Sequence, residues 1–464
     1  VDTRTGGLTP EKDILCTEGK IEAIAPTGSL KIEDGTRVVD ASGQYAVPGF
    51  LDMHMHIVGE KDAPQMLMLT LANGITGSRQ LGGSPELRQA WKGGAFTGAS
   101  DKPDLLTMPG EGLLSFNAST PQEAVAQVRE QKKQGTGFIK VIQTTPEVAF
   151  AVLAEAKNQN LKVVGHVLGD MDVSAASRAG FHCVEHLGPN EVELISSSTE
   201  EQSLRAQADH LPAILGSPVL RLGFVQAMLG DVTAELLINP YANTIADKSK
   251  KVQRIVDTYS PDKARALAAL FIVNGTWQCP TLIRLKTSQL AFLGEFKTDP
   301  NLVYESPADL AQWRKVTSAW EKRLTPERKA VAQRLYARDL ELVKLFDDQG
   351  VKMMAGSDAE GGGWTVAGFS LHQEFDELEK AGISPLHVLQ MTTLNGAEFL
   401  GRTSTMGTVE PGKIADLVLL NANPVESIQN LHRISAVVRL GTFYGQADLE
   451  AMKARVKESY QKSK

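Results

Sequence analysis

The chain has 464 residues, 42% of them hydrophobic, and a formal net charge of −7 at pH 7. A chain of this length can bury one large core and a smaller one. The negative charge and the absence of Lys/Arg runs exclude a nucleic acid as the expected partner, because phosphate binding needs clustered cations. No apolar stretch reaches the ~20 residues that a membrane-spanning helix needs.

The two ends of the chain share a pattern of short strands separated by turns. Residues 13–24 contain two apolar runs around a Glu-Gly turn, and residues from about 404 to 445 read in the same way. We therefore expect 1–46 and 404–464 to form one small β-sandwich domain. The chain starts at Val1, which we interpret as a removed leader or a trimmed end, and we expect an exported protein, periplasmic or secreted, in preference to a cytoplasmic one.

The most informative motif is the His-x-His of His54 and His56, which follows an apolar run. Side chains two residues apart on a strand point to the same side, so one metal ion can bind both imidazoles. Three more groups follow short strand-like runs in the same way, namely His166, His186 and Asp358. A parallel barrel gathers the C-terminal ends of its strands at one rim. Any one histidine could be a buried structural imidazole, but the repetition at successive strand ends predicts a metal site.

Between the two ends, strand-like runs alternate with helix-like ones. Residues 121–134 and 146–160 have helical patterns, and this alternation is typical of a parallel α/β sheet. Together with the strand-end ligands, it predicts an α/β fold in which residues 47–403 form a (β/α)8 TIM barrel. Residues 277–282 are the best candidate for the seventh strand, where we expect them to form part of the pocket wall.

Lys140 lies in the apolar run 137–142, where an ammonium group would lose its hydration at a cost of several kcal/mol. Carboxylation by carbon dioxide would remove that cost, because the resulting carbamate is an anion that can bridge two cations. The alternative is an ordinary lysine near a strand end whose amine reaches water. The histidine pattern favours the carbamate.

The interval from about 190 to 345 is long for the βα units that it must contain. It includes helix-patterned segments at 203–228, 261–273 and 326–348. Because insertions after barrel strands lie on the catalytic rim, we expect a helical cap over the metals. A decorative or oligomerising insertion is the alternative. The glycine run 361–363 could form a mobile rim loop, but no phosphate-binding motif surrounds it.

With these residues in view, the chain resembles the amidohydrolase superfamily, in the branch that contains imidazolonepropionase-like enzymes and metal-dependent dipeptidases. Residues 72–79 are similar to the second-strand Gly-Val-Thr-Thr segment, although Gly77 replaces the second Thr. Residues 407–418 are similar to the signature of the small β-domain that follows the barrel. The resemblance spans nearly the whole chain apart from the interval of about 190–345.

The resemblance implies two divalent metal ions, most simply zinc, and N6-carboxylation of Lys140. Its metal ligands are carried over as His54, His56, Lys140, His166, His186 and Asp358. A hydroxide bridging the ions would form at neutral pH, because metal binding brings the pKa of water to about 7. Asp358 is the expected general base. A mononuclear site with unmodified Lys140 would also be compatible with the histidine spacing.

The leading hypothesis for the reaction is hydrolysis of an amide-type carbon–nitrogen bond, such as that of a dipeptide or an N-acyl amino acid. A phosphotriesterase or lactonase using the same centre is the alternative, and a non-catalytic scaffold is a second alternative. A cyclic imidazolone substrate is disfavoured, because that subfamily commonly lacks the bridging lysine.

Two residues are candidates for substrate contact. Arg79 could bind a carboxylate, although a salt bridge at the rim is the competing interpretation, and His372 could face the substrate or be structural. We expect a small-molecule substrate, no nucleic-acid partner, no membrane span and a homo-oligomer.

Overall fold

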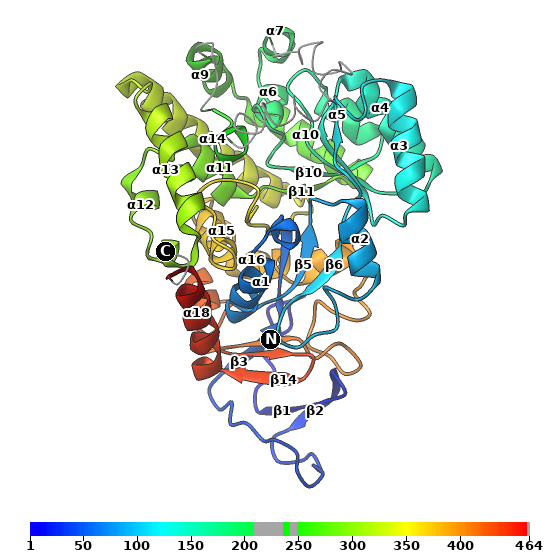
Figure 1. Cartoon of the computed structure of the whole chain (residues 1–464), viewed down its shortest axis with the longest axis vertical. Helices are drawn as coiled ribbons and strands as arrows, with labels where there is room; N and C mark the ends of the chain where they lie inside the picture. The colour runs from blue at the N-terminus through cyan, green and yellow to red at the C-terminus, as the bar shows by residue number, and fades with distance from the viewer. Residues whose placement is uncertain (208–234, 242–247, 462–464) are drawn as a thin grey trace.

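The structure is a computed structural model of the whole chain, and it describes residues 1–207, 235–241 and 248–461. Figure 1 shows small antiparallel sheets at one end of the molecule and a group of helices, including α7 (Glu201–Ala206) and α9 (Ser249–Asp257), at the other. Parallel strands surrounded by helices lie between these ends. No helix in the described residues is long and apolar enough to cross a membrane.

Two parallel sheets form the centre of the molecule. The first has three strands in the order β4 (Phe50–Met55), β5 (Ile75–Gln80) and β6 (Asp104–Thr107). The second has five strands in the order β11 (Trp277–Cys279), β10 (Phe181–Glu185), β9 (Val163–Gly165), β8 (Ile139–Gln143) and β7 (Leu113–Leu114). Parallel strands joined through helices define an α/β fold, so this prediction is confirmed.

Backbone hydrogen bonds link the two sheets. On one side, Met53 N donates to Ala355 O at 3.0 Å and Met354 N donates to Gln278 O at 2.9 Å, so residues 352–359 lie between β4 and β11. On the other side, Gly137 N donates to Met108 O at 3.0 Å. The expected strand before Asp358 is therefore an extended segment with isolated bridges at Met353 and Ala359.

The helices of the βα units begin where the sequence provides a hydroxyl cap followed by proline. Thr120 accepts from Glu123 N before α3, and Thr325 accepts from Arg328 N before α14. The same Ser/Thr-Pro start is found in α2, α4, α10, α13 and α16. The helices of this central region are α1 (Ala63–Ala72), α2 (Pro85–Lys92), α3 (Pro121–Lys133), α4 (Pro146–Asn158), α5 (Val173–Arg178), α15 (Phe369–Lys380), α16 (Pro385–Met391) and α17 (Leu394–Phe399), with the 3-10 turn η1 (Ile57–Gly59).

The described part of the interval from about 190 to 345 is mainly helical, apart from the short strand β11. Its helices are α6 (Val192–Ser196), α7, α9, α10 (Pro261–Asn274), α11 (Leu282–Gln289), α12 (Gly294–Lys297), η4 (Pro300–Tyr304), α13 (Pro307–Glu321) and α14 (Pro326–Gln349). The predicted helices at 261–273 and 326–348 agree with α10 and α14 to within one residue. Most of the helix expected at 203–228 lies outside the described residues.

The two ends of the chain meet in one antiparallel sheet. Its order is β14 (Thr442–Gly445), β13 (Ile434–Arg439), β12 (Leu417–Leu420) and β3 (Tyr45–Pro48), with Leu417 opposite Pro48. The hairpin of β1 (Lys12–Thr17) and β2 (Lys20–Pro26) joins residues 412–415 through backbone bonds. The turn η5 (Ile428–His432) and helix α18 (Gln446–Gln461) complete this end.

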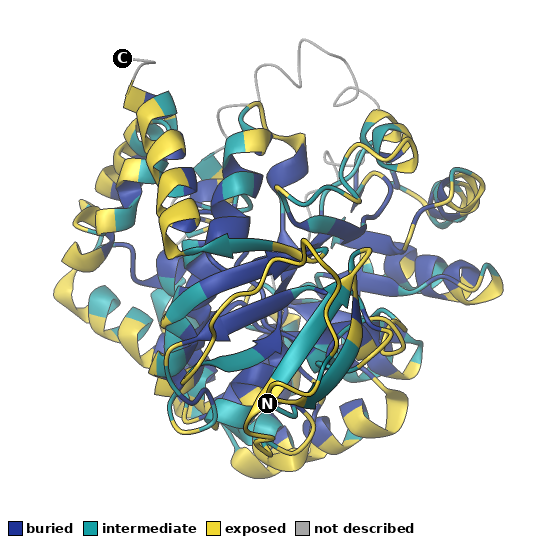
Figure 2. Cartoon of the chain, turned by 90° about the horizontal axis from the view of Figure 1, so that it is seen from below, coloured by how far each residue is buried: buried dark blue, intermediate teal, exposed yellow. Residues whose placement is uncertain are grey.

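The buried residues lie where the strands and helices pack against one another. All six residues of β4 and all six of β5 are buried, and the largest core cluster joins strand residues such as Val163 and Val184 to helix residues such as Val152 and Phe346. Figure 2 shows the buried residues along the strands and the exposed residues on the outer faces of the helices. Polar residues inside this interior therefore need specific partners.

Candidate metal centre

The six expected ligand residues all lie at the two parallel sheets or in the segment that links them. His54 is in β4 and His56 follows that strand, Lys140 is in β8, and His166 and His186 follow β9 and β10 directly. Asp358 ends the linking segment, where its backbone N–H donates to His54 O at 2.8 Å.

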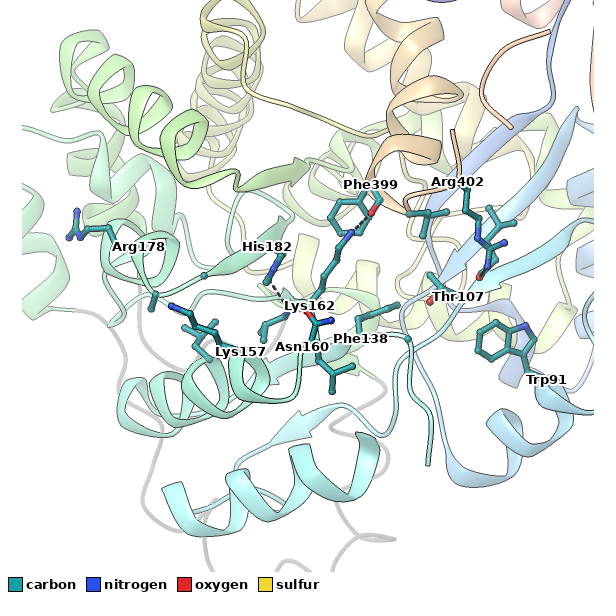
Figure 3. A pocket seen from close by; sticks show the side chains of 18 residues that line it. Trp91, Thr107, Phe138, Lys157, Asn160, Lys162, Arg178, His182, Phe399 and Arg402 are labelled. Carbon is teal, nitrogen blue, oxygen red and sulfur yellow. Dashed lines mark hydrogen bonds between the residues drawn. The ribbon is translucent and has the colours of Figure 1, made fainter. Parts of the chain in front are cut away.

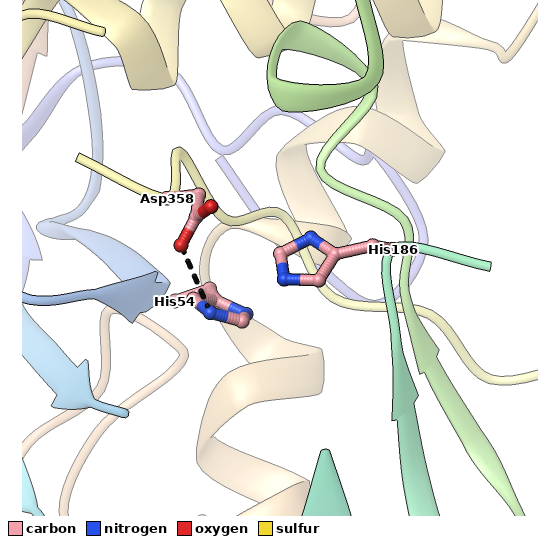
Figure 4. A group of neighbouring side chains, drawn as sticks. All are labelled: His54, His186 and Asp358. Carbon is pink, nitrogen blue, oxygen red and sulfur yellow. Dashed lines mark ion pairs between the residues drawn. The ribbon is translucent and has the colours of Figure 1, made fainter. Parts of the chain in front are cut away.

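Three of these side chains bring their ligand atoms close together. Atoms of His54, His186 and Asp358 all lie within 4.8 Å of one another, and Figure 4 shows the three groups converging. His54 Nε2 and His56 Nε2 lie 3.1 Å and 3.3 Å from Asp358 Oδ1. The ring centroids of His54 and His186 are 4.5 Å apart, and those of His166 and His186 are 5.3 Å apart.

In three of the histidines, an oxygen atom occupies the Nδ1 side of the ring. His54 Nδ1 lies 2.7 Å from Glu185 Oε2, and His166 Nδ1 lies 3.0 Å from Ile142 O. His186 Nδ1 lies 2.5 Å from Thr281 Oγ1, whose hydroxyl donates to Pro280 O. Each of these oxygens can accept a hydrogen bond from Nδ1–H, and in that tautomer the lone pair is on Nε2. This arrangement orients neutral imidazoles as metal ligands.

Lys140 has the environment that carboxylation would explain. Its side chain is 1% exposed, and Nζ makes no hydrogen bond within the described residues. Burial lowers the pKa of Lys140, and Glu185 and Asp358 are the nearby negative charges that oppose this shift. A buried amine with a lowered pKa is more often neutral, and the neutral amine is the form that reacts with carbon dioxide.

Burial also shifts the pKa values of the other candidate ligands. Burial lowers the pKa of His56, and it lowers the pKa values of His166 and His186 well below the ordinary value, so the rings are neutral at pH 7. Burial alone would raise the pKa of Asp358, but its interactions with the His54 and His186 imidazoles hold it well below its usual range. The site therefore presents neutral imidazoles and an ionised carboxylate, which are the forms that bind a cation.

Unsatisfied polar atoms converge at the same place. His54 Nε2, Asp358 Oδ1 and Lys140 Nζ are buried and make no hydrogen bond within the described part of the chain. Buried polar atoms are normally paired, so three together indicate an additional group. Nitrogen and carboxylate ligands in this combination fit divalent ions such as zinc.

Arg79 lies behind the metal-type ligands and not in an open rim position. It is fully buried on β5, its Nε donates to Met53 O at 2.5 Å, and its Nη2 lies 2.8 Å from Glu185 Oε1. Burial alone would raise the pKa of Glu185, but Arg79 and His54 hold the pKa of that carboxyl below its usual range. The guanidinium thus supports Glu185, which in turn orients His54, and the structure does not place it where a substrate carboxylate could reach it.

His372 lies at the other end of β4 from the candidate metal ligands. On α15, its Nε2 is 2.8 Å from Asn73 O, and its ring packs edge-on against Phe50, the first residue of β4. His432 Nδ1 contacts its other nitrogen at 3.1 Å. The structure therefore does not bring His372 together with the six other candidates.

Sequence reasoning missed several residues that complete the site. Glu185 and Thr281 orient two histidines, and Arg284 of α11 places Nε 3.2 Å from Asp358 Oδ2. The guanidinium of Arg284 also donates to Ile238 O and Leu237 O, so the helical interval does supply a side chain to the site.

The glycine run after Asp358 was the signal that could have revealed this close packing. A Cβ at residue 361 would lie 2.2 Å from Asp358 Oδ1, and one at residue 362 would lie 2.3 Å from the guanidinium of Arg284. Only glycine allows the loop to pass so close to both side chains. The run is therefore a close-fitting wall of the site in this structure.

Three residues of the site have left-handed backbone conformations that are unusual for non-glycine residues. The φ angles are 58° at His186, 45° at Thr281 and 54° at Asp358. Such strain is costly and gathers where the surrounding structure holds side chains in functional positions. Asp52 fixes the segment beside it, because its carboxylate accepts from His54 N at 3.1 Å and from Ser357 N at 3.0 Å.

Comparisons with known proteins find similarity to amidohydrolases. A family model described as "Amidohydrolase family" matches residues 332–444. Imidazolonepropionase of Symbiobacterium thermophilum is 24% identical over 434 residues, which cover 90% of this chain and 85% of that protein. The first curated relatives are adenine deaminases that match over short segments: the protein of Rhizobium meliloti is 39% identical over 57 residues, which are 10% of its length.

Solved structures share the fold. A bottromycin amidohydrolase superposes with a TM-score of 0.67 at 19% identity, covering 99% of this chain and 88% of that one. A Xaa-Pro dipeptidase with bound methionine in the active site superposes with a TM-score of 0.61 at 19% identity, covering 96% and 97%. Together, the family match over residues 332–444 and the similarity to an imidazolonepropionase are consistent with the amidohydrolase superfamily, in its imidazolonepropionase-like branch.

Proposed function

We propose that this chain is a binuclear metal-dependent hydrolase that cleaves an amide-type carbon–nitrogen bond in a dipeptide or an N-acyl amino acid. The observation that carries the proposal is the convergence of His54, His186 and Asp358, together with a buried Lys140 Nζ that makes no hydrogen bond within the described residues. The match of residues 332–444 to the amidohydrolase family model supports hydrolysis at carbon–nitrogen bonds as the class of reaction. The presence of all six expected ligands argues against a non-catalytic scaffold.

We also propose how the sheets close into a barrel and how the chain ends form a second domain. The two parallel sheets and residues 352–359 would close into a (β/α)8 TIM barrel, because hydrogen bonds link the sheets on both sides. The small sheets made by both chain ends would form the β-sandwich. In such a barrel the ligands at the C-terminal ends of the strands share one rim.

The donor set divides between two ions. His54, His56 and Asp358 would hold one divalent ion, His166 and His186 the other, and carboxylated Lys140 would bridge them. When bound, two such ions, most simply zinc, supply Lewis-acid polarisation of a carbonyl and make water acidic enough to react at neutral pH.

Asp358 would act as the general base. Its Oδ1 faces His54 and His56, while its Oδ2 is held by Arg284 Nε at 3.2 Å. Because its low pKa keeps the carboxylate ionised at neutral pH, Oδ1 can take a proton from the attacking water and return it to the leaving nitrogen. Arg284 fixes the carboxylate orientation during this transfer.

The choice of dipeptides and N-acyl amino acids follows from the relatives. One structural neighbour is described as a Xaa-Pro dipeptidase and another as a bottromycin amidohydrolase. The helical interval covers the site from one side through Arg284, so its residues are placed to select the substrate.

Hydrolysis of a panel tests this proposal. The zinc-reconstituted protein is incubated with dipeptides, N-acyl amino acids, a phosphotriester and a lactone, and product is followed by mass spectrometry. We expect turnover of a dipeptide or an N-acyl amino acid, and at least a ~10²-fold fall in kcat for Asp358→Asn. His387→Gln, an exposed histidine bonded to Asp347, is the matched control and should keep wild-type kcat. Turnover of only the phosphotriester or the lactone would contradict the proposed substrate class.

A further inference from the structure

A second pocket lies away from the candidate metal centre. It has a volume of about 700 Å³ and is lined by residues around the N-terminal ends of β8, β9 and β10, including Phe138, Lys162 and His182. In Figure 3, Trp91 and Arg178 lie at opposite ends of this pocket, with Lys162 and Phe399 between them. Its size is that of an ordinary small-molecule site.

The pocket and the metal-type ligands occupy opposite ends of the same strands. Lys162 precedes β9 and His166 follows it, so the three residues of this strand separate them, and the four residue-to-residue steps span roughly 13 Å. None of the six candidate metal ligands lines the pocket. A ligand here would be bound independently of the metals.

The charge of the pocket is strongly one-sided. Its lining includes Lys157, Lys162, Arg178 and Arg402, and none of the described lining residues is Asp or Glu. This contrasts with the whole chain, in which acidic residues outnumber basic ones, 55 to 48. A concave surface of one sign concentrates ions of the other sign, so the pocket attracts anions.

Most of this positive charge is not cancelled by neighbours. Lys162 Nζ and Arg402 Nη2 donate to the carbonyls of Phe399 and Leu106, which are neutral acceptors. Arg178 lies 3.9 Å from Asp172, a loose and exposed pair, and Lys157 has no ion pair within the described residues. Lys157 and Arg178 stand in the last turns of α4 and α5, where a cation is favourable, and their N–H groups remain available to a ligand.

Three aromatic side chains, Trp91, Phe138 and Phe399, also line the pocket, and we call them the aromatic wall. Phe138 and Phe399 are buried at the inner side, and Trp91 is fixed by its Nε1 donating to Leu105 O at 3.0 Å. Lys162 Nζ lies 4.2 Å from the ring centroid of Phe399, so the Lys162 ammonium group lies over the ring of Phe399. Aromatic faces of this kind bind flat apolar groups.

We propose that this pocket is a second binding site, for a small organic anion that carries a phosphate or carboxylate on a flat apolar body. The anionic group would be bound by Lys157 and Arg178 at one end of the pocket, and the flat body would lie between the ends, against Lys162 and Phe399. The site is separate from the proposed hydrolytic centre and does not depend on its chemistry.

Isothermal titration calorimetry of the zinc-reconstituted protein tests the proposal with phenyl phosphate, benzoate and inorganic phosphate as probes. We expect phenyl phosphate or benzoate to bind at least ~10-fold more tightly than inorganic phosphate, because only they reach the aromatic wall. The better of the two identifies the anionic group. Binding should weaken at least ~10-fold in Lys157→Gln/Arg178→Gln and in Lys162→Met, and also with added salt.

The matched control is Lys132→Gln/Lys133→Gln, which removes the same charge from exposed positions of α3 outside the pocket. It should bind the probes as the wild type does, and circular dichroism confirms that each variant is folded. Titration after removal of the metal with a chelator separates the two sites. Absence of binding by all three probes, unchanged affinity in the folded pocket variants, or loss of binding on metal removal would overturn the proposal.

Discussion

At the level of single residues, the site depends on what lies behind each histidine. Glu185, the Ile142 carbonyl and Thr281 occupy the Nδ1 sides of three rings, so their Nε2 atoms face the centre. Oxygens in these positions set the tautomer and the orientation of a ligand before any ion binds. Glu185 is itself held by Arg79, which makes this buried pair part of the support of His54.

The buried pair of Arg79 and Glu185 gives a stability prediction. Both side chains are fully buried and lie 2.8 Å apart. Arg79→Met leaves the Glu185 carboxylate in the interior without its cation, so we expect the free energy of unfolding to fall by about 3–5 kcal/mol. Urea denaturation measures this, and the double variant Arg79→Met/Glu185→Gln should recover part of the loss.

The control for this experiment is Arg334→Met, because Arg334 pairs with Asp257 and both side chains are 48% exposed. An exposed pair contributes at most about 1 kcal/mol. Equal losses in Arg79→Met and Arg334→Met would show that the buried pair has no special role.

Glu193 on α6 gives a prediction for the pH dependence of stability. It is fully buried, and burial raises its pKa to about 8 from 4.5. Between these values the folded chain retains a proton that the unfolded chain has lost, so this group makes stability fall as pH rises from about 5 to 8. Its contribution to that fall is on the order of 3 kcal/mol.

Glu193→Gln removes this titration. Urea denaturation at pH 5, 6, 7 and 8 should give a flatter profile for the variant than for the wild type, with the variant relatively more stable at pH 8. Asp339 and Glu374, whose pKa values burial also raises to about 8, keep their effect in both proteins. Parallel profiles for wild type and variant would contradict the assignment.

At the level of elements, the loop after Asp358 determines how closely the site is packed. A Cβ at residue 361 would lie 2.2 Å from Asp358 Oδ1 and 2.7 Å from His56 Cδ2. Gly361→Ala must therefore displace one of these candidate ligands, and we expect at least a ~10-fold loss of zinc affinity with the fold retained. A zinc titration against a competing chelator measures this change.

Gly294→Ala is the matched control, because a Cβ at residue 294 meets no atom within 4 Å. Its zinc affinity should equal that of the wild type, and its stability should change by less than about 0.5 kcal/mol. Wild-type zinc affinity in Gly361→Ala would mean that the loop is free to move away from Asp358.

The elements that the sequence predicted well are those with strong local signals. Helices α3, α10 and α14 begin at the expected prolines, since a Ser or Thr cap followed by Pro fixes a helix start locally. The segment before Asp358 was expected as a strand, but its pairing is confined to isolated bridges. Whether an extended run becomes a regular strand depends on partners distant in sequence, which the local pattern does not contain.

The same contrast holds for the candidate site. The histidines and Asp358 could be predicted because each follows an apolar strand, and strand ends meet at one rim. Arg284 could not, because it belongs to a helix far along the chain and reaches Asp358 only through tertiary packing. Arg79 and His372 were candidates for substrate contact because their residue types suit substrate binding. Both are buried instead, where Arg79 bonds Glu185 and His372 bonds the Asn73 carbonyl.

At the level of the whole molecule, the small sheet is tied to the parallel strands by one buried arginine. Arg439 of β13 is fully buried and donates from Nη1 to both carboxylate oxygens of Asp416, at 3.0 Å and 2.9 Å. It also bonds Asp104, the first residue of β6, and its Nε donates to Lys102 O. The ends of the chain and its central sheets are therefore coupled.

Arg439→Met should destabilise the whole protein, because it leaves two carboxylates near each other without their shared cation. We expect a loss of about 3 kcal/mol, seen as a lower melting temperature in differential scanning calorimetry. Arg433→Met, an exposed position preceding the same strand, is the control and should melt as the wild type does. An unchanged melting temperature in Arg439→Met would show that the two parts are stabilised separately.

The central claim is a pair of metal ions joined through Lys140, and the metal content of the purified protein tests it most directly. Plasma mass spectrometry after reconstitution with zinc and bicarbonate should give about two ions per chain, and about one or fewer in Lys140→Ala, because the bridging anion is lost. Acetate should restore part of the metal by occupying the space of the missing carbamate. No bound metal in the reconstituted wild type, or about two ions in both proteins, would contradict the account.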